Sequence, residues 1–303
     1  MSSEKTEITE SDSSEEISLD EEISSGQVAE KPNDVGDPSG VIEKAIPRDI
    51  RERYDVYSYR NAAVILSETR SEEFGDLLQA LRNFQITTKM IRTAGGNESD
   101  IPKLLSNSLR PLGWHETVVQ GDLHVKRIWR EQVGVLGKGK NKGKPKFGKK
   151  EEEIKREKYL DGHKIDYVKG RVAFDLEWNS KDQTFDRDLY AFSAFFQCGV
   201  IDVGVLVTRS KSLDEVFKEL GQALKRDGET PDFTSAGKPR PTSGKFGAST
   251  TWVGKLLYRL NAGRNGGCPV LVLGITPRCI SDWPKEANAT EPLKTDSAPP
   301  ANG

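Results

Sequence analysis

Residues 165–179 read IDYVKGRVAFDLEWN, and this stretch decides the fold of the chain. Lys169 and Gly170 form a turn signal between two runs of strand-forming residues. After the turn, apolar and polar residues alternate with a period of two, which is typical of a β-strand with two unlike faces. One face carries the apolar residues Phe174, Leu176 and Trp178. The other face carries Asp175, Glu177 and Asn179 and is acidic. The stretch therefore predicts a β-hairpin with one acidic face.

The position of the turn also predicts which acids meet. A two-residue or four-residue turn centred on Lys169 and Gly170 places Asp166 opposite Ala173. Directly paired residues point to the same side of a sheet, so Asp166 joins the acidic face. Asp175 is then its diagonal neighbour, with Cα atoms roughly 7 to 8 Å apart and carboxylates able to lean together.

Three carboxylates on one small patch repel one another unless a cation or a proton intervenes. A hard divalent ion such as Mg²⁺ suits them, because it prefers oxygen ligands and keeps several waters that a phosphate can replace. An acidic face on a hairpin can equally be solvated, and the spacing D-x8-D-x-E is a weak pattern on its own. The hairpin by itself leaves both interpretations open.

Periodic patterns on both sides of the hairpin extend it into an α/β domain. Apolar residues at helical spacing predict helices that begin near residues 71, 100, 186, 212 and 251, with Asp186 as the cap of the third. Apolar runs predict strands over residues 62–66, 117–129, 200–208 and 268–275. The runs at 200–208 and 268–275 are apolar enough to be covered on both faces of a sheet.

Charge is distributed unevenly along the chain. Residues 1–46 hold 13 acidic residues against 3 lysines and lack aromatic residues, a composition typical of a disordered acidic tail. Residues 47–303 carry 42 basic and 34 acidic residues, a net charge of +8, although the whole chain is at −2. A basic body favours a polyanionic partner such as nucleic acid. We expect one folded domain over residues 47–283 and a second disordered tail over 284–303.

Cysteine, histidine and hydropathy patterns exclude several other classes of protein. The three cysteines, Cys198, Cys268 and Cys279, form no C-x-x-C pair, so neither a disulfide framework nor a zinc finger is expected. The three histidines also lack metal-ligand spacing. No apolar run approaches transmembrane length, and the first residues do not form a secretory signal. We therefore expect a cytoplasmic protein without a membrane span.

Residues 137–150 read GKGKNKGKPKFGKK, with seven lysines and no acidic residue. We expect a flexible cationic loop there. The loop could clamp a phosphate backbone, or it could be a solvated insertion, and the sequence favours neither interpretation. A nucleotide-binding phosphate loop is not expected, because Gly137 and Gly143 are one residue too far apart for the G-x-x-x-x-G-K pattern.

The hairpin stretch, followed by a helix and the strand VIDVGVLVT at residues 200–208, resembles the active-site core of the BamHI/BglII-type restriction endonucleases in the PD-(D/E)XK nuclease superfamily. The resemblance covers about residues 160–210 well and the flanking elements more loosely. It implies a restriction-endonuclease-like core with a central mixed β-sheet flanked by helices. It also implies Mg²⁺-dependent cleavage of double-stranded DNA by a homodimer at a short palindrome.

The resemblance further implies which residues are catalytic. Asp166 matches the family's first metal-binding aspartate, Asp175 matches the second acid, and Glu177 stands where many superfamily members carry lysine. Glu or Gln at that position is similar to the BamHI/BglII branch in particular. The implied catalytic residues are therefore Asp166, Asp175 and Glu177, with Asp166 and Asp175 holding Mg²⁺.

Taken together, the patterns predict a type II site-specific deoxyribonuclease. The alternatives are a repair or mobile-element nuclease on the same core, a DNA-binding protein without cleavage, and an RNA-associated adaptor that uses the lysine-rich segment. Three carboxylates favour catalysis over binding alone, because without a cation they repel a nucleic acid.

Overall fold

A computed structural model describes residues 36–95, 99–160 and 164–284. Most of the two predicted tails lies outside these ranges. Residues 36–46 lie inside the predicted acidic tail, yet Ser39–Ala45 form helix α2, and Ile46 is buried in the core. Regular structure therefore includes residues before the predicted boundary at residue 47.

A six-stranded mixed sheet forms the centre of the molecule, with the strand order β1-β8-β7-β6-β5-β2. Strands β6, β7 and β8 run parallel, whereas β1, β5 and β2 are antiparallel to their neighbours. The strands are β1 (Tyr54–Tyr59), β2 (His115–Val118), β5 (Lys164–Lys169), β6 (Val172–Glu177), β7 (Val203–Arg209) and β8 (Val270–Ile275). The predicted α/β class with a central mixed sheet is confirmed.

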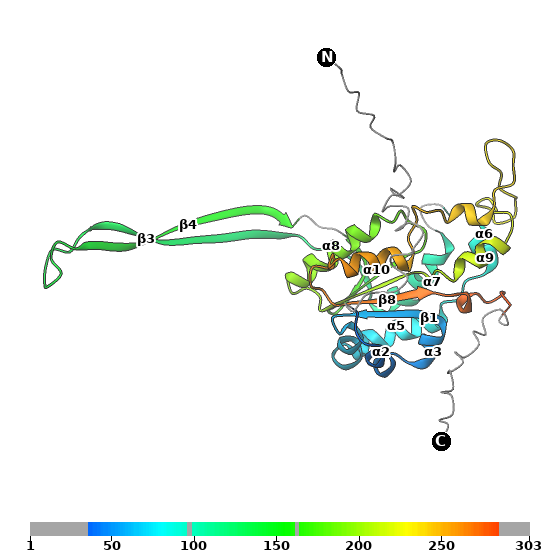
Figure 1. Cartoon of the computed structure of the whole chain (residues 1–303), viewed down its shortest axis with the longest axis horizontal. Coiled ribbons are helices and arrows are strands. Elements are labelled where there is room, and N and C mark those ends of the chain that lie inside the picture. The colour runs from blue at the N-terminus through cyan, green and yellow to red at the C-terminus, as the bar shows by residue number, and fades with distance from the viewer. Residues whose placement is uncertain (1–35, 96–98, 161–163, 285–303) are drawn as a thin grey trace, which may run out of the picture.

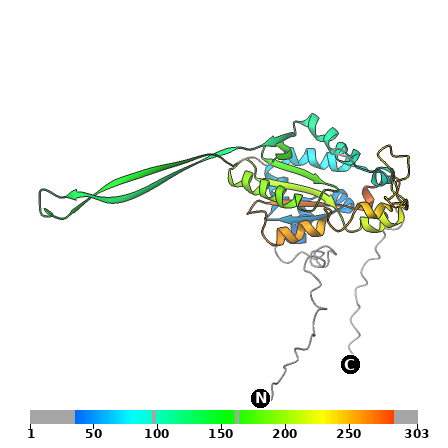
Figure 2. The same ribbon diagram turned by 90° about the horizontal axis from the view of Figure 1, so that it is seen from above.

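Helices cover both faces of this sheet, and two hydrophobic cores result (Figures 1 and 2). One face packs against α5 (Ser71–Asn83) and α7 (Asp100–Leu109), with the short helices α3 (Arg48–Arg53) and α9 (Leu213–Glu219) in the same core. The other face packs against α8 (Thr184–Gln197) and α10 (Val253–Asn261). The apolar runs predicted to be covered on both sides are β7 and β8, whose residues are all buried.

Most predicted helices are confirmed, and one predicted strand is wrong. Apolar residues at helical spacing place α5 and α7 where the sequence predicts them. Residues 62–66, predicted as a strand, instead form α4 (Ala62–Val64) and the start of a π-helical turn, η1 (Ile65–Thr69). Periodicity cannot separate a short apolar strand from a buried helical turn. The edge strand at this end of the sheet is the preceding β1, which pairs with β8 along its whole length.

Strands β3 (Gly121–Val135) and β4 (Pro145–Leu160) form a separate two-stranded ribbon that projects from the body (Figure 1). The ribbon continues the β2–β5 pair outward, because Val118 faces Lys164 and Gly121 faces Leu160. The prediction of a loop over residues 137–150 is wrong in part: residues 145–150 belong to β4, and only the turn between the strands is irregular.

A further short α-helix of the body, α6 (Thr88–Arg92), precedes α7 in the chain. Within the described ranges no helix is both long and apolar enough to cross a membrane.

Candidate active site

The β5–β6 hairpin places Asp166 directly beside Asp175. Its two-residue turn is Gly170-Arg171, and Gly170 has a φ of 53°, in the region that glycine adopts most easily. Lys169 therefore pairs with Val172, and the register differs by two residues from the predicted pairing of Asp166 with Ala173. Continued by one residue, the observed register sets Asp166 opposite Asp175. The Asp166 backbone N–H donates to Asp175 Oδ1 at 2.8 Å.

The acidic face of β6 is buried beneath a helix instead of lying open on the hairpin. Asp175 is 4% exposed and Glu177 is 7% exposed, whereas Asp166 lies at the surface. Helix α8 covers this face and contributes a third buried acid, Asp188, which is 2% exposed. The structure therefore brings the three predicted site residues together and adds a fourth carboxylate.

Close packing of α8 on the sheet sets the position of Asp188. Gly204 of β7 lies directly under Phe192 of α8, and a Cβ atom at residue 204 would overlap the Phe192 ring. Phe192 is one helical turn after Asp188, so the contact that allows the helix to approach the sheet also brings Asp188 down to the acids of β6. A sequence feature of β7 thus positions a side chain of α8.

Arg187 links the acids of the helix and the strand. Its guanidinium Nη2 lies 3.1 Å from Asp188 Oδ1 and 3.6 Å from Glu177 Oε1. Arg187 is half-exposed, so it supplies positive charge from the solvent side of the acids. Arg187 therefore contacts Oε1 of Glu177 and Oδ1 of Asp188, and it leaves Oε2 and Oδ2 of these carboxylates without an ion-pair contact to it.

Burial raises the pKa values of all three buried acids, and repulsion from neighbouring carboxylates adds to this effect for Asp175 and Asp188. Desolvation is the largest cause for Asp175, whose pKa is well above its ordinary value, and the negative charges of Asp188 and Asp166 raise it further. Burial also raises the pKa of Glu177. For Asp188, burial followed by the charge of Glu177 raises the pKa to about 8. Groups in this state gain from any bound cation that neutralises them.

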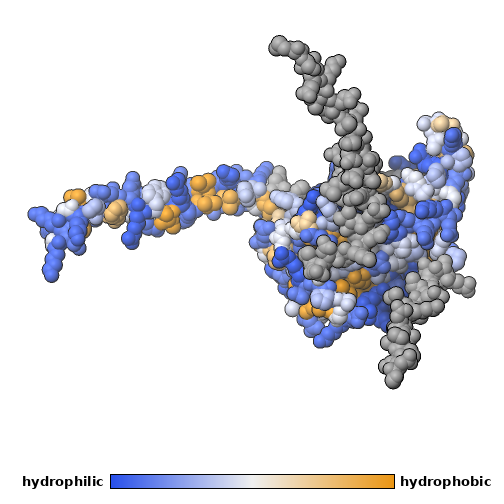
Figure 3. Space-filling model, in the orientation of Figure 1, coloured by the Kyte–Doolittle hydropathy of each residue, from blue (hydrophilic) through white to orange (hydrophobic). Residues whose placement is uncertain are grey.

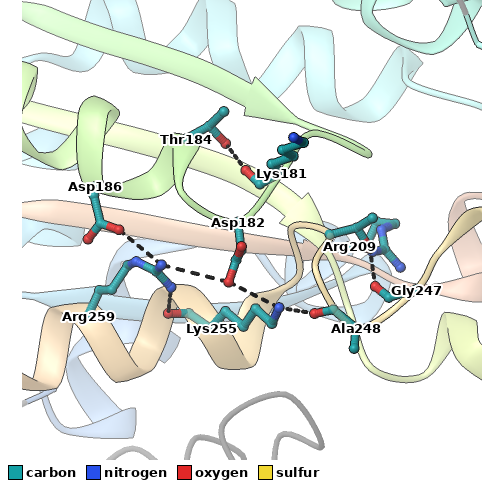
Figure 4. A network of polar contacts seen from close by, with 10 residues as sticks. Lys181, Asp182, Thr184, Asp186, Arg209, Gly247, Ala248, Lys255 and Arg259 are labelled. Atoms are coloured by element: carbon teal, nitrogen blue, oxygen red, sulfur yellow. Dashed lines mark hydrogen bonds and ion pairs between the residues drawn. The ribbon is translucent and has the colours of Figure 1, made fainter. Parts of the chain in front are cut away.

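A network of ion pairs anchors the start of α8 to α10 (Figure 4). Lys255 of α10 is almost fully buried; it contacts Asp182 Oδ2 at 3.1 Å and donates to the Ala248 carbonyl. Arg259 contacts Asp186 Oδ2 at 3.0 Å. Asp186 is thus an ion-pair partner and not the predicted cap, because the residue at the N-cap position is Gln183. The network holds the start of α8 in place, and Arg187 and Asp188 follow directly after Asp186 on this helix.

A cleft of about 470 Å³ opens beside the end of β6. Its walls include Leu176, Trp178 and Asn179, together with the basic side chains of Arg240 and Lys245. Asn179, which the sequence places on the acidic face, donates through Nδ2 to the Lys245 carbonyl. Leu176 and Trp178 lie on the face of β6 opposite Asp175 and Glu177, so the cleft lies near the end of the strand and does not contain the acids.

The buried acids fit a divalent cation by their donor chemistry. In the part of the chain that the structure describes, Asp175 Oδ2, Glu177 Oε2 and Asp188 Oδ2 are buried without a hydrogen-bond partner. A hard ion prefers such oxygen ligands and would supply the partner that each atom lacks. Within the same ranges, no group of three or more His, Cys, Asp or Glu side chains is already arranged as a metal site. The fit therefore concerns the kind and number of donors, not a finished coordination shell.

Sequence reasoning missed Asp188 and Arg187. A signal for Asp188 is present: it lies three residues after Phe185 and four before Phe192, on the apolar side of a helix. An acid on a buried helix face is rare unless it has a partner, so it marks a candidate site. Arg187 carries no comparable signal, because arginines on exposed helix positions are common.

The fold and site together define a class of protein. A six-stranded mixed sheet flanked by helices, with acids on a hairpin and on the strand that follows its turn, is consistent with the restriction-endonuclease-like fold. A family model described as restriction endonuclease BglII/BglIII matches residues 54–275. The chain belongs to this family. No curated protein matches the chain in a sequence search.

Proposed function

We propose that the chain is a Mg²⁺-dependent type II restriction endonuclease, which hydrolyses phosphodiester bonds of double-stranded DNA at a short specific site. Family membership supports a site-specific nuclease of this type. Restriction endonucleases of this kind generally use Mg²⁺. The observation that carries the proposal is the group of three buried carboxylates on β6 and α8, each with one unpartnered oxygen.

In this proposal Asp166 and Asp175 hold the ion, and Glu177 orients the attacking water. When bound, the ion polarises the scissile phosphate and lowers the pKa of a coordinated water. The backbone N–H of Asp166 fixes Asp175 Oδ1, which leaves Oδ2 available to the ion. Arg187 restrains Glu177 Oε1 in the same way and leaves Oε2 available to the water. Asp188 positions Glu177 and Arg187 from the side of the helix.

The test of the proposal is a comparison of wild type with Asp175→Asn. Wild type incubated with phage or plasmid DNA and MgCl₂ should give discrete bands. Asp175→Asn should reduce cleavage by roughly a hundredfold or more, the scale expected when one preorganised charged group is lost from a reaction centre. DNA binding in EDTA should persist, because the substitution removes a negative charge near the phosphate.

A second readout does not depend on activity. An ion that binds only the folded state raises its thermal midpoint, so MgCl₂ should stabilise wild type and should stabilise Asp175→Asn much less. Glu219→Gln, which changes an exposed acid on α9, is the control and should behave as wild type in both assays. Binding of DNA without cleavage by wild type would instead indicate a DNA-binding protein that has lost catalysis.

A further inference from the structure

The β3–β4 ribbon is a large element with no packing partner among the described residues. Its strands of 15 and 16 residues extend for about 50 Å at the usual rise per residue. Almost every side chain on it is exposed, including large apolar ones such as Ile128 at 57% and Phe147 at 59%. Figure 3 shows several hydrophobic patches among hydrophilic ones along the ribbon. An isolated two-stranded ribbon is only marginally stable in water, so a partner that covers it would stabilise it.

Charge separates the ribbon into two halves. In the half near the body, acids and bases are mixed and form ion pairs with one another, such as Lys155 with Glu153 at 3.7 Å and Arg127 with Glu152 at 3.6 Å. The distal half, residues 129–150, differs, because it carries Arg130 and seven lysines against a single acid, Glu131, and all seven lysines lie in residues 137–150. Within the described ranges, no carboxylate lies within ion-pair distance of Lys138, Lys140, Lys142, Lys144 or Lys146.

An excess of positive charge at the distal end favours one kind of partner. A second copy of the chain would bring a like-charged ribbon end if the two ends met, and such an arrangement is repulsive. A nucleic-acid backbone offers regularly spaced negative charge that can match lysines on both strands and in the turn. A two-stranded ribbon also has dimensions that fit a groove of double-stranded DNA.

We propose that the distal half of the β3–β4 ribbon binds the phosphate backbone of duplex DNA outside the cleavage site, without reading its sequence. The inference rests on the proposed function, because it assumes that the acids of β5 and β6 act on the same DNA. Leu160, at the base of the ribbon, is six residues before Asp166, so their Cα atoms are at most about 21 Å apart. The ribbon then extends for more than one helical turn of DNA, about 34 Å, beyond its base.

The proposal is tested by binding to random-sequence duplexes of 40 and 14 base pairs in EDTA, where cleavage does not occur. The test variant changes Lys138, Lys140, Lys142, Lys144 and Lys146 to Gln. The matched control removes the same number of charges from the proximal half by changing Lys126, Arg127, Lys155, Arg156 and Lys158 to Gln. Circular dichroism should show that both variants keep the fold of the body, because all ten side chains are exposed on the ribbon.

The distal variant should bind the 40-base-pair duplex at least tenfold more weakly than wild type at low salt. Its plot of log affinity against log salt should be shallower by about 3 to 4, as expected for several lost phosphate contacts. Affinity for the 14-base-pair duplex should change little, and the control should lose less affinity for the longer duplex. The distal variant should cleave a plasmid into fragments of the wild-type sizes, because the choice of site is unchanged, but it should need more enzyme to do so, because its affinity for DNA is lower.

Three other results would overturn the proposal. Equal affinity and salt dependence of wild type and the distal variant on the long duplex would show that the ribbon does not contact the backbone. Loss of self-association in sedimentation, with DNA binding unchanged, would assign the ribbon to a second copy of the chain. Uniform loss on both duplexes would place the lysines at the cleavage site itself. Failure of wild type to cleave any DNA would count against the proposed function, while the binding comparison would still decide the role of the ribbon.

Discussion

At the scale of single residues, the site keeps buried carboxylates where a stable core would have apolar side chains. Asp175 and Asp188 are almost fully buried, and each has an oxygen without a hydrogen-bond partner in the described part of the chain. Such groups lower stability unless something compensates them. Their position on adjacent elements, with raised pKa values, is the pattern of a functional site.

We predict opposite effects for two aspartates on α8. Asp188→Asn should raise the thermal midpoint slightly at neutral pH. Folding of wild type must either bury the Asp188 charge beside Glu177 or bind a proton there, and the neutral amide needs neither. It should also lower kcat for cleavage by about 10-fold to 100-fold with little change in KM for DNA, since Glu177 and Arg187 lose their positioning partner. Steady-state cleavage in MgCl₂ measures kcat and KM, and thermal unfolding in EDTA measures the change in stability.

Asp186→Asn is the control on the same helix. It weakens ion pairs with Arg259 and Arg264, so it should lower stability by roughly 1 kcal/mol. Cleavage should stay within a few-fold of wild type, because the contact between Lys255 and Asp182 still holds the start of α8 in place. If Asp188→Asn also leaves kcat unchanged, Asp188 has only a structural role.

At the scale of elements, the geometry of the site depends on how α8 rests on β7. Gly204 has no side chain, which allows the Phe192 ring to occupy the space directly above the strand. Ion pairs of Lys255 and Arg259 with Asp182 and Asp186 hold the same helix near its start. The helix is therefore fixed at two points, with Asp188 between them.

We predict that Gly204→Ala destabilises the protein by about 1 to 3 kcal/mol, the usual cost of overpacking a core. The new methyl group would displace Phe192 and move α8 away from β6, so cleavage should fall as well. Urea unfolding measures the change in stability. Gly75→Ala is a matched control, because Gly75 lies on an exposed position of α5 with nothing within 4 Å of the new Cβ. It should stabilise the protein by about 0.5 to 1 kcal/mol, and a loss at residue 75 equal to that at residue 204 would contradict the packing argument.

At the scale of the whole molecule, the chain consists of a body with an acidic site and a basic ribbon that projects from it (Figure 1). Residues 121–160 of the ribbon carry 13 basic and 6 acidic residues, so they hold +7 of the +8 net charge of residues 47–303. A single site of this kind acts on one strand at a time. Cleavage of both strands at a symmetric sequence is simplest for two copies related by a two-fold axis.

We therefore predict that two chains bind each cognate duplex. Sedimentation of Asp175→Asn on DNA that contains the recognition sequence should give a mass of two chains per duplex, because this variant binds without cleaving. One chain per duplex, together with nicks in only one strand, would point to a nicking or repair nuclease.

Much of the fold follows from patterns that are local in the sequence. Helices α5 and α7, and the buried strands β7 and β8, lie where apolar spacing predicts them, because burial of one face or of both faces leaves a direct trace in the residue order. The error at residues 62–66 arose from a run too short to carry such a trace. The sequence does not predict that residues 145–150 are part of a strand, because closely spaced glycines and lysines are typical of a loop.

The sequence alone determined that Asp166, Asp175 and Glu177 share one face of a hairpin. Side chains alternate between the two faces of a strand, so a register shift of two residues leaves each of them on the same face. Only the tertiary structure decided that Asp166 lies opposite Asp175, since the register depends on which residues form the turn, and Gly170 takes its first position. Only the tertiary structure brought Asp188 to the same acids. That contact depends on the distance between a helix and a sheet, which close packing of side chains far apart in the chain sets, and no local pattern encodes it.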